Sequence, residues 1–85
     1  MKKDWFVYLV RCSDESLYCG ISTDVKRRVE EHNFSKKGAK YTRSRRPVSL
    51  IGFLRAGNRS EAQKLEFKIK KMKRENKIKF FQLDS

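Results

Sequence analysis

The fold is decided near the amino terminus by the stretch WFVYLVRCSDESLYCGIS, residues 5–22. Residues 5–11 are aromatic or β-branched at nearly every position, a composition typical of a strand covered on both faces. The polar residues 12–16 predict a turn, and residues 17–22 predict a second strand that completes a β-hairpin.

The register of this hairpin depends on its loop. A two-residue loop at Asp14-Glu15 places Tyr8 and Tyr18 on opposite faces of the sheet, because opposed residues share a face and the side-chain period is two. A three-residue loop with a bulge brings both tyrosines to the same face, but it requires a residue near Glu15 in the left-handed conformation, where glycine is usual. The sequence leaves both registers open.

A helix is expected after the hairpin. Thr23 is the expected N-cap, Asp24 is favourable in the first helical turn, and the helix is expected to run to about His32. At about 100° per residue, Arg27 points away from the apolar side of this helix, whereas Arg28 lies at the border of the apolar stripe. We therefore expect Arg27 to be solvated and Arg28 to reach along the sheet.

The second half of the chain predicts a third strand and more helix. The strand is expected from Val48 to Leu54, and Gly52 within it indicates a bulge or the close approach of another segment. The next helix is expected to begin with Ser60 as its N-cap, with Gln63 completing a capping box. Residues 77–83 suit either a strand or a short helix, and we favour the helix.

Length and composition limit what the chain can be. With 85 residues there is room for one modest core, so we expect a single domain over residues 1–85, an α+β fold in which helices flank a three-stranded antiparallel sheet. No apolar run approaches the roughly 20 residues of a membrane span, and no signal sequence is evident, so a soluble, cytoplasmic protein is expected. Cys12 and Cys19 are too few for a disulfide framework and are expected to be buried free thiols.

The net charge indicates the class of partner. The chain has 22 Lys and Arg against 10 Asp and Glu, a net charge of +12, which favours a polyanion such as nucleic acid. A membrane surface is the second option, but the sequence lacks a long amphipathic helix with aromatic residues on its apolar face.

The periodic pattern disappears between Asn33 and Arg46, where cations and small polar residues dominate and no acid occurs. This composition is typical of a loop that contacts phosphates, and a merely flexible, solvated loop is the alternative. The residues expected to bind nucleic acid are Lys36, Lys37, Lys40, Tyr41, Arg43, Arg45 and Arg46.

Phosphodiester cleavage needs a nucleophilic water with a base, a cation for the developing charge and usually a carboxylate-bound metal. Glu66 stands out among the carboxylates because it flanks the apolar arc of a cationic helix, although an ion pair with Lys70 explains it more simply. Tyr8 and Tyr18 are also explained as packing residues, and His32 as either a general base or a cation at a helix end. Taken singly, these residues do not decide the function.

Taken in order, the same residues resemble the GIY-YIG nuclease superfamily over nearly the whole chain. Its first motif corresponds to Phe6-Val7-Tyr8 and its second to Tyr18-Cys19-Gly20, and Arg28 and His32 follow at eight and twelve residues after Gly20, with Glu66 on a later helix. Residues 38–43 and 46–48 resemble most closely the small stand-alone bacterial members. Phe6 stands where the first motif has glycine, and the family's late asparagine has no secure counterpart, because Asn76 lies close to Glu66.

The resemblance implies a role for each of these residues. Glu66 would hold one Mg²⁺ or Mn²⁺ ion, Tyr8 would orient or deprotonate the attacking water, and Arg28 would stabilise the transition state. Tyr18 and His32 would complete the polar shell, with Tyr41 as a further catalytic or phosphate-contacting residue. The implied function is a metal-dependent endonuclease that cuts DNA with little sequence specificity. The alternative is a non-catalytic nucleic-acid-binding protein on the same scaffold.

Overall fold

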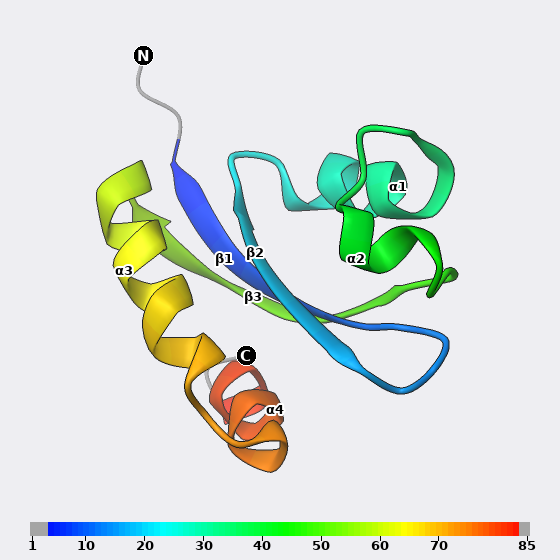
Figure 1. The fold of residues 1–85 in the computed structure, drawn as a ribbon. Coiled ribbons are helices and arrows are strands. Elements are labelled where there is room, and N and C mark those ends of the chain that lie inside the picture. The colour runs from blue at the N-terminus through cyan, green and yellow to red at the C-terminus, as the bar shows by residue number, and fades with distance from the viewer. Residues whose placement is uncertain (1–3, 84–85) are drawn as a thin grey trace.

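The computed structural model describes residues 4–83, which form an α+β fold (Figure 1). Its three strands make one antiparallel sheet in the order β2-β1-β3, so the predicted fold class is confirmed. The elements in chain order are β1 (Trp5–Arg11), β2 (Leu17–Ser22), α1 (Val25–Phe34), α2 (Lys40–Arg43), β3 (Ser49–Gly57), α3 (Arg59–Lys70) and α4 (Arg74–Leu83).

The central strand β1 sends alternate side chains into two helical layers. Val7 and Leu9 pack in a cluster with α3 and α4, whereas Tyr8 and Val10 pack in a cluster with α1. Figure 1 shows α1 and α2 on one side of the sheet and α3 and α4 on the other. All four side chains are at most 1% exposed, and each buried aliphatic one contributes about 1.5–3 kcal/mol. The prediction that β1 is covered on both faces is confirmed.

The hairpin has the register that unites the two tyrosines. Val10 is opposite Tyr18, and Tyr8 is opposite Gly20. Because opposed residues share a face, Tyr8 and Tyr18 both project towards α1. Of the two registers that the sequence allows, the one with the longer loop is therefore adopted.

The tip of the hairpin is a three-residue loop, residues 13–15. A backbone hydrogen bond of 2.8 Å from the Cys12 N–H to the Ser16 carbonyl closes it. Glu15 has a φ of 70°, the left-handed conformation predicted for this loop. A residue with a Cβ adopts that conformation at a cost of about 1–2 kcal/mol, so the loop carries strain at Glu15.

Two arginines hold this tip from opposite sides of the molecule. Arg45, which follows α2, lies 3.0 Å from the Asp14 carboxylate through its Nε. Arg74, the first residue of α4, donates from Nη1 to the Glu15 carbonyl. The tip is thus fastened to both helical layers.

Strand β3 is longer than predicted and contains a bulge. Leu9 pairs with Gly52 and Val10 pairs with Leu50, so one extra residue stands between them. A Cβ on Gly52 would lie 3.0 Å from the Cβ of Phe81 in α4, so both interpretations of this glycine are confirmed. The predicted end at Leu54 is wrong, because β1 offers pairing partners back to Trp5 and β3 follows it to Gly57.

Helix α1 begins one residue later than predicted. Its N-cap is Asp24 and not Thr23. The Asp24 side chain accepts a hydrogen bond of 3.1 Å from the Arg27 N–H. Asp is at least as good a cap as Thr, so the sequence does not separate the two. The helix extends to Phe34, two residues beyond His32.

Helix α3 begins earlier than predicted. Asn58 caps it by accepting a hydrogen bond of 2.8 Å from the Glu61 N–H, so the prediction of Ser60 as N-cap is wrong. The helix therefore starts at Arg59 and includes Ser60, and the Asn58 side chain satisfies one of the backbone amides in its first turn.

Residues 40–43, expected as part of a loop, form the short helix α2, and β3 begins at Ser49 and not at Val48. Residues 77–83 are helical, as favoured, within α4. Cys12 and Cys19 are buried and free. Within residues 4–83 no helix is long and apolar enough to cross a membrane.

Candidate active site beside the edge strand

Tyr8 lies on the central strand, and its side chain crosses the neighbouring strand β2. Its ring passes directly over Gly20: a Cβ at that position would lie 2.5 Å from the Tyr8 Oη and 2.7 Å from its Cζ. The glycine of the second motif is therefore needed for packing, because any side chain there would displace the phenol. The Tyr8 hydroxyl is thereby directed towards the β2 edge of the sheet.

His32 projects from α1 onto the hydroxyl of Tyr8. The Tyr8 Oη lies 2.7 Å from the His32 Nε2, and both side chains are fully or almost fully buried. The other ring nitrogen, Nδ1, lies 3.0 Å from the Thr42 Oγ1 and accepts the Ala39 N–H at 3.2 Å. Burial lowers the pKa of His32 to about 4, and the positive charges of Arg28 and Arg46 add to this. His32 is therefore neutral at pH 7, which contradicts its interpretation as a cation at the helix end.

Tyr18 is the more accessible of the two motif tyrosines. It is half-buried, whereas Tyr8 is 1% exposed. The Tyr18 ring meets the edge of the His32 ring at a centroid distance of 5.3 Å and stacks on Tyr41 of α2 at 5.9 Å. The Arg45 guanidinium lies 4.0 Å above the Tyr41 ring. These contacts place the Tyr18 ring between the buried cluster and the surface.

Arg28 lies at the side of the same cluster. Its Nη1 donates to the Glu31 carboxylate at 3.0 Å and to the Lys37 carbonyl at 2.8 Å. The Arg28 side chain is 26% exposed and that of Arg27 is 56% exposed, as the helical periodicity predicts. Burial raises the pKa of the Tyr8 phenol well above its usual range, and the positive charge of Arg28 opposes this only in part.

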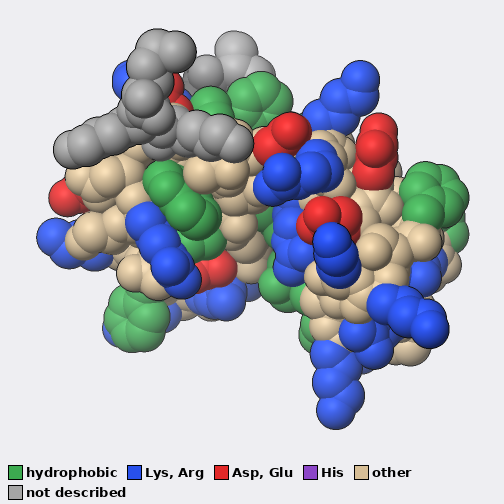
Figure 2. All heavy atoms as spheres, turned by 90° about the horizontal axis from the view of Figure 1, so that it is seen from above, with side chains coloured by type: hydrophobic (Ala, Val, Ile, Leu, Met, Phe, Trp, Pro, Cys, Tyr) green, Lys and Arg blue, Asp and Glu red, His purple; other side chains and the backbone are tan. Residues whose placement is uncertain are grey.

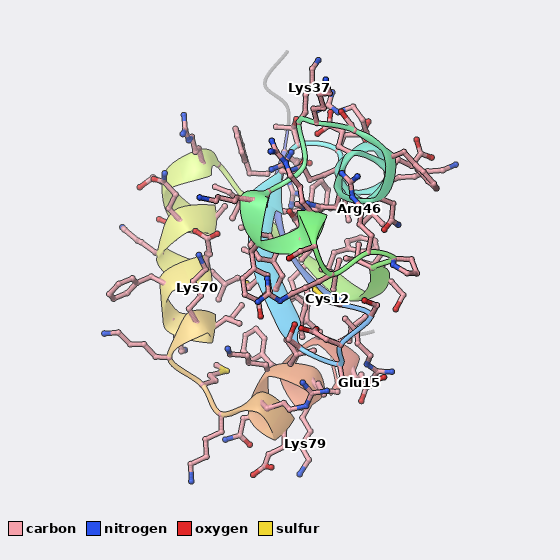
Figure 3. The ribbon with its side chains drawn as sticks, turned by 45° about the vertical axis from the view of Figure 1, so that its right-hand side comes forward. Cys12, Glu15, Lys37, Arg46, Lys70 and Lys79 are labelled. Atoms are coloured by element: carbon pink, nitrogen blue, oxygen red, sulfur yellow. The ribbon has the colours of Figure 1, made fainter. Side chains whose placement is uncertain are left out.

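Glu66 occupies a different place from the other predicted catalytic residues. It lies on α3, which covers the opposite face of the sheet, and its Oε2 is 3.5 Å from the Lys70 Nζ. Burial raises the pKa of Cys19 to about 12, and the negative charge of Glu66 contributes to this, so the carboxylate lies near β2. In Figure 3, α3 with Lys70 runs along one side of β2, and α2 is drawn across the upper part of that strand. Glu66 therefore does not share the face of the sheet on which Tyr8 and Tyr18 lie with α1; it adjoins the edge strand from the other face.

The basic segment between α1 and β3 is ordered, and its arginines hold it in place. The segment contains α2. Arg46, labelled in Figure 3, donates from Nε to the His32 carbonyl and from Nη2 to the Ser35 carbonyl, each at 2.5 Å. Arg46 thereby satisfies carbonyl groups at the end of α1. Arg43 donates to the Lys36 carbonyl at 2.6 Å. The cations of this segment with exposed side chains that are not engaged in these contacts are Lys36, Lys37 and Lys40.

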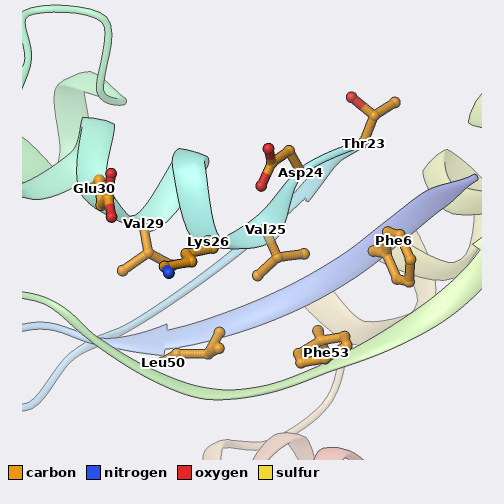
Figure 4. Close-up of a pocket in the computed structure, with 9 residues that line it drawn as sticks. All are labelled: Phe6, Thr23, Asp24, Val25, Lys26, Val29, Glu30, Leu50 and Phe53. Atoms are coloured by element: carbon orange, nitrogen blue, oxygen red, sulfur yellow. The ribbon is translucent and has the colours of Figure 1, made fainter. Parts of the chain in front are cut away.

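A separate hollow of about 460 Å³ lies between α1 and the β3 side of the sheet (Figure 4). Its apolar wall includes Phe6, Leu50 and Phe53. None of the predicted site residues lines it. The tyrosine–histidine cluster lies on the β2 side of the sheet, so the hollow belongs to a different part of the surface.

Comparison with known proteins identifies the family. Residues 4–79 match the sequence model described as the GIY-YIG catalytic domain. This chain belongs to the GIY-YIG family. It is 56% identical over 68 residues to the UPF0213 protein DP2720 of Desulfotalea psychrophila, covering 80% of this chain and 62% of that relative. It is 50% identical over 76 residues to the UPF0213 protein H16_B0156 of Cupriavidus necator, covering 89% of this chain and 82% of that protein.

Two solved structures share the fold of this GIY-YIG domain. The solution NMR structure of the protein EF2693 from E. faecalis has a TM-score of 0.63 and 43% identity, covering 93% of this chain and 83% of that one. The solution NMR structure of the UPF0213 protein BH0048 from Bacillus halodurans has a TM-score of 0.55 and 39% identity, covering 91% and 81%. The predicted relationship to small bacterial members of the superfamily is confirmed.

The donor set of this GIY-YIG domain fits a divalent cation bound by one carboxylate. Within the part of the chain that the structure describes, no three His, Cys, Asp or Glu side chains form a metal cage. Mg²⁺ commonly uses one or two carboxylates together with waters and substrate phosphates. The Glu66 side chain is 22% exposed, so a hydrated ion can reach its carboxylate, where it would compete with the Lys70 ammonium 3.5 Å away.

Three residues of the site were not predicted from the sequence. Thr42 and the Ala39 amide hold the His32 ring, and Gly38 lies against α1 beside them. A polar side chain that is completely buried, such as that of Thr42, nearly always has a hydrogen-bond partner. Within a basic loop without periodicity, however, no pattern distinguishes it from a solvated threonine.

Proposed function

We propose that this GIY-YIG protein is a metal-dependent endonuclease that hydrolyses phosphodiester bonds in DNA with little sequence specificity. The observation that carries the proposal is the cluster of Tyr8, Tyr18, His32 and Arg28 beside the edge strand, with Glu66 next to the same strand. The family match supports a nuclease. A cytoplasmic location suits such an enzyme.

The burial of the two tyrosines divides their roles. Tyr8 is 1% exposed and its pKa is raised by burial, so its hydroxyl stays protonated and is screened from substrate. Tyr18 is half-buried and reaches the surface beside Tyr41. We therefore assign the contact with the attacking water to Tyr18, and we assign Tyr8 to positioning the cluster behind it. This reverses the role that the family resemblance implied for Tyr8.

Arg28 and Glu66 would supply the electrostatic part of the mechanism. Arg28 is always protonated and its planar fork suits phosphate oxygens, so it can exchange its contacts with Glu31 and Lys37 for the developing charge. Glu66 would hold the Mg²⁺ or Mn²⁺ ion. The bound ion would neutralise phosphate charge and polarise the scissile oxygen.

The surface charge suits contacts to the phosphate backbone. Figure 2 shows Lys and Arg side chains spread over one face of the molecule, with Asp and Glu scattered singly among them. Dispersed cations bind phosphates without reading bases, which is the basis for low sequence specificity. Lys36, Lys37 and Lys40 are the exposed cations that flank the cluster, on the segment that carries Tyr41.

A second candidate function is nucleic-acid binding without turnover. The placement of Glu66 on the far face of the sheet, paired with Lys70, favours it. On this alternative the same basic surface binds nucleic acid and Glu66 serves only to pair with lysine.

Cleavage assays with matched variants separate the two functions. Purified protein is incubated with supercoiled plasmid and with single-stranded and branched oligonucleotides in Mg²⁺ or Mn²⁺. Glu66→Ala is expected to abolish nicking, whereas Glu61→Ala, which removes an exposed carboxylate from the same helix, is expected to retain it. No nicking by the unmodified protein, or nicking that survives both Glu66→Ala and Arg28→Ala, contradicts the proposal.

The division of roles between the tyrosines has its own test. Tyr18→Phe is expected to lower the rate of nicking by about 10²–10⁴, the usual contribution of a positioned acid–base group. Tyr8→Phe is expected to reduce stability more than rate, because it leaves the buried His32 nitrogen without a partner. Equal rate losses in the two variants would contradict the assignment of Tyr18.

A further inference from the structure

The His32 ring is held at both nitrogens by groups of different kinds. A hydroxyl hydrogen can rotate, so the contacts of Nε2 with Tyr8 and of Nδ1 with Thr42 do not fix where the imidazole proton lies. The hydrogen of the Ala39 amide is different, because the plane of the peptide fixes its direction. It points at Nδ1 with a nitrogen–nitrogen distance of 3.2 Å.

This amide decides between the two neutral forms of the ring. A proton on Nδ1 would face the Ala39 hydrogen, whereas a lone pair on Nδ1 accepts it. The proton of neutral His32 therefore lies on Nε2, where it points at the Tyr8 Oη.

The Thr42 hydroxyl is compatible with this form. Its oxygen lies 3.0 Å from Nδ1 and 2.9 Å from the Ala39 carbonyl oxygen, so its one hydrogen can be directed at either acceptor. That carbonyl also accepts the Thr42 N–H at 3.0 Å, so it keeps a partner when the hydroxyl donates to Nδ1.

We propose that residues 38–42 lock His32 in the neutral tautomer protonated at Nε2, so that His32 is a fixed hydrogen-bond donor to the Tyr8 Oη. The hydroxyl hydrogen of Tyr8 then points away from His32. The tautomer follows from these contacts alone, whereas its use in cleavage rests on the proposed function. On that function Gly38, Ala39 and Thr42 are positioning residues that act through His32.

Gly38 allows this segment to lie close enough to α1. A Cβ at Gly38 would be 2.7 Å from the Glu31 carbonyl oxygen and 2.9 Å from the Cα of His32, both backbone atoms that cannot move aside locally. Any larger residue would push the following amide away from Nδ1. The glycine therefore sets the distance on which the lock depends.

The charges around His32 keep it neutral. The ring faces Tyr8 from β1, Tyr18 from β2, Thr42 from α2, Arg28 and Glu31 from its own helix, and Arg46 from the segment before β3. Burial and the two arginines disfavour a second proton, and only the Glu31 carboxylate opposes them.

The tautomer is directly observable because His32 is the only histidine of the chain. Two-bond proton–nitrogen NMR spectra of ¹⁵N-histidine-labelled full-length protein distinguish a protonated ring nitrogen from one with a lone pair. We expect Nε2 protonated and Nδ1 unprotonated, unchanged from about pH 8 to about pH 5.5, a range in which an ordinary histidine titrates near 6.5. A protonated Nδ1, or a titration near the ordinary pKa, overturns the proposal.

Two variants identify the group that sets the tautomer. Thr42→Val removes the hydroxyl but keeps the Ala39 amide, so the Nε2-protonated form is expected to persist, and a switch to Nδ1 protonation overturns the proposal. Gly38→Ala is expected to displace the amide and give averaged nitrogen shifts with a higher titration midpoint. If Gly38→Ala keeps a folded amide spectrum and an unchanged tautomer, residues 38–42 are not the lock.

These measurements require no turnover. A protein that never nicks DNA but shows the expected tautomer contradicts the proposed function and leaves the inference intact, whereas an active enzyme with Nδ1 protonated does the reverse. If Gly38→Ala does not fold, the unmodified protein and Thr42→Val still decide the matter.

Discussion

Gly20 sets how closely the Tyr8 ring can lie on β2. Gly20→Ala would bring a methyl group within 2.5 Å of the Tyr8 Oη, so we expect the ring to shift and its hydrogen bond with His32 to break. Overpacking of this kind typically costs about 1–3 kcal/mol, which urea unfolding measures directly.

A double variant shows whether the clash with the Tyr8 hydroxyl is the cause. Tyr8→Phe removes the nearest atom, so the destabilisation of Tyr8→Phe/Gly20→Ala is expected to be smaller than the sum of the two single effects. Strictly additive effects would mean that Gly20 acts on stability by another route.

Protonation of His32 should make the protein less stable in mild acid. The pKa of His32 is about 4 in the folded protein and about 6.5 when unfolded, so between these values the unfolded chain binds more protons than the folded one. The free energy of unfolding contributed by His32 is fully present above about pH 6.5 and declines as the pH falls towards 4, by roughly 3 kcal/mol in total. Urea unfolding at a series of pH values measures this.

His32→Gln is the control for this pH dependence. It removes the titrating ring and can keep a donor near Tyr8, so the slope of stability against pH between about 6.5 and 4 should become shallower. An equal slope in both proteins would assign the effect to carboxylates instead.

Sequence patterns predict the presence of the helices and strands but not all of their boundaries. Strands, helices and the bulge at Gly52 follow from composition and periodicity, which report burial. The starts of α1 and α3 do not, because Asp24, Thr23, Asn58 and Ser60 are chemically similar caps, and the choice depends on where the neighbouring strand ends. The hairpin register was open for a comparable reason: local turn preference disfavours a left-handed Glu15, whereas packing of Tyr8 over Gly20 needs it.

Replacing Glu15 by glycine should therefore stabilise the hairpin. Glycine adopts a φ of 70° without a steric cost, so Glu15→Gly is expected to raise the free energy of unfolding by up to about 1 kcal/mol. Thermal unfolding measures the gain. Glu15→Ala, which removes the exposed carboxylate near Arg11 but keeps the Cβ, is the matched control and should show no gain; equal gains would point to the carboxylate and not to backbone strain.

At the scale of the whole molecule, the site combines parts that the sequence predicts with parts that it does not. Order and spacing select Tyr8, Tyr18, Arg28 and His32, but the hairpin register that brings the two tyrosines to one face beside His32 is fixed only in the structure. The position of Glu66 depends on which face α3 covers, which no local pattern contains. The basic segment was likewise predicted by charge, but the use of Arg46 to hold α1 required the fold.

The salt dependence of binding should locate the surface that meets the phosphates. A triple variant Lys36→Ala/Lys37→Ala/Lys40→Ala is expected to reduce the log–log slope of duplex affinity against salt by about 0.9 for each phosphate that these lysines neutralise. A triple variant at three exposed lysines, Lys64 and Lys68 of α3 and its C-cap Lys71, removes the same charge and is expected to change the slope less. Equal changes would mean that the segment around α2 is not the phosphate-binding surface.

The hairpin tip held by Arg45 and Arg74 also has a consequence for folding kinetics. These contacts join residues 31 and 59 positions apart along the chain, and each arginine belongs to a different helical layer. Contacts between distant residues incur a larger loop-closure entropy, so we expect the strands of the hairpin to pair early and the two arginines to engage only after both layers have docked. The same turn should then be among the first parts to detach on unfolding, which makes its amides early reporters of the opening of either layer.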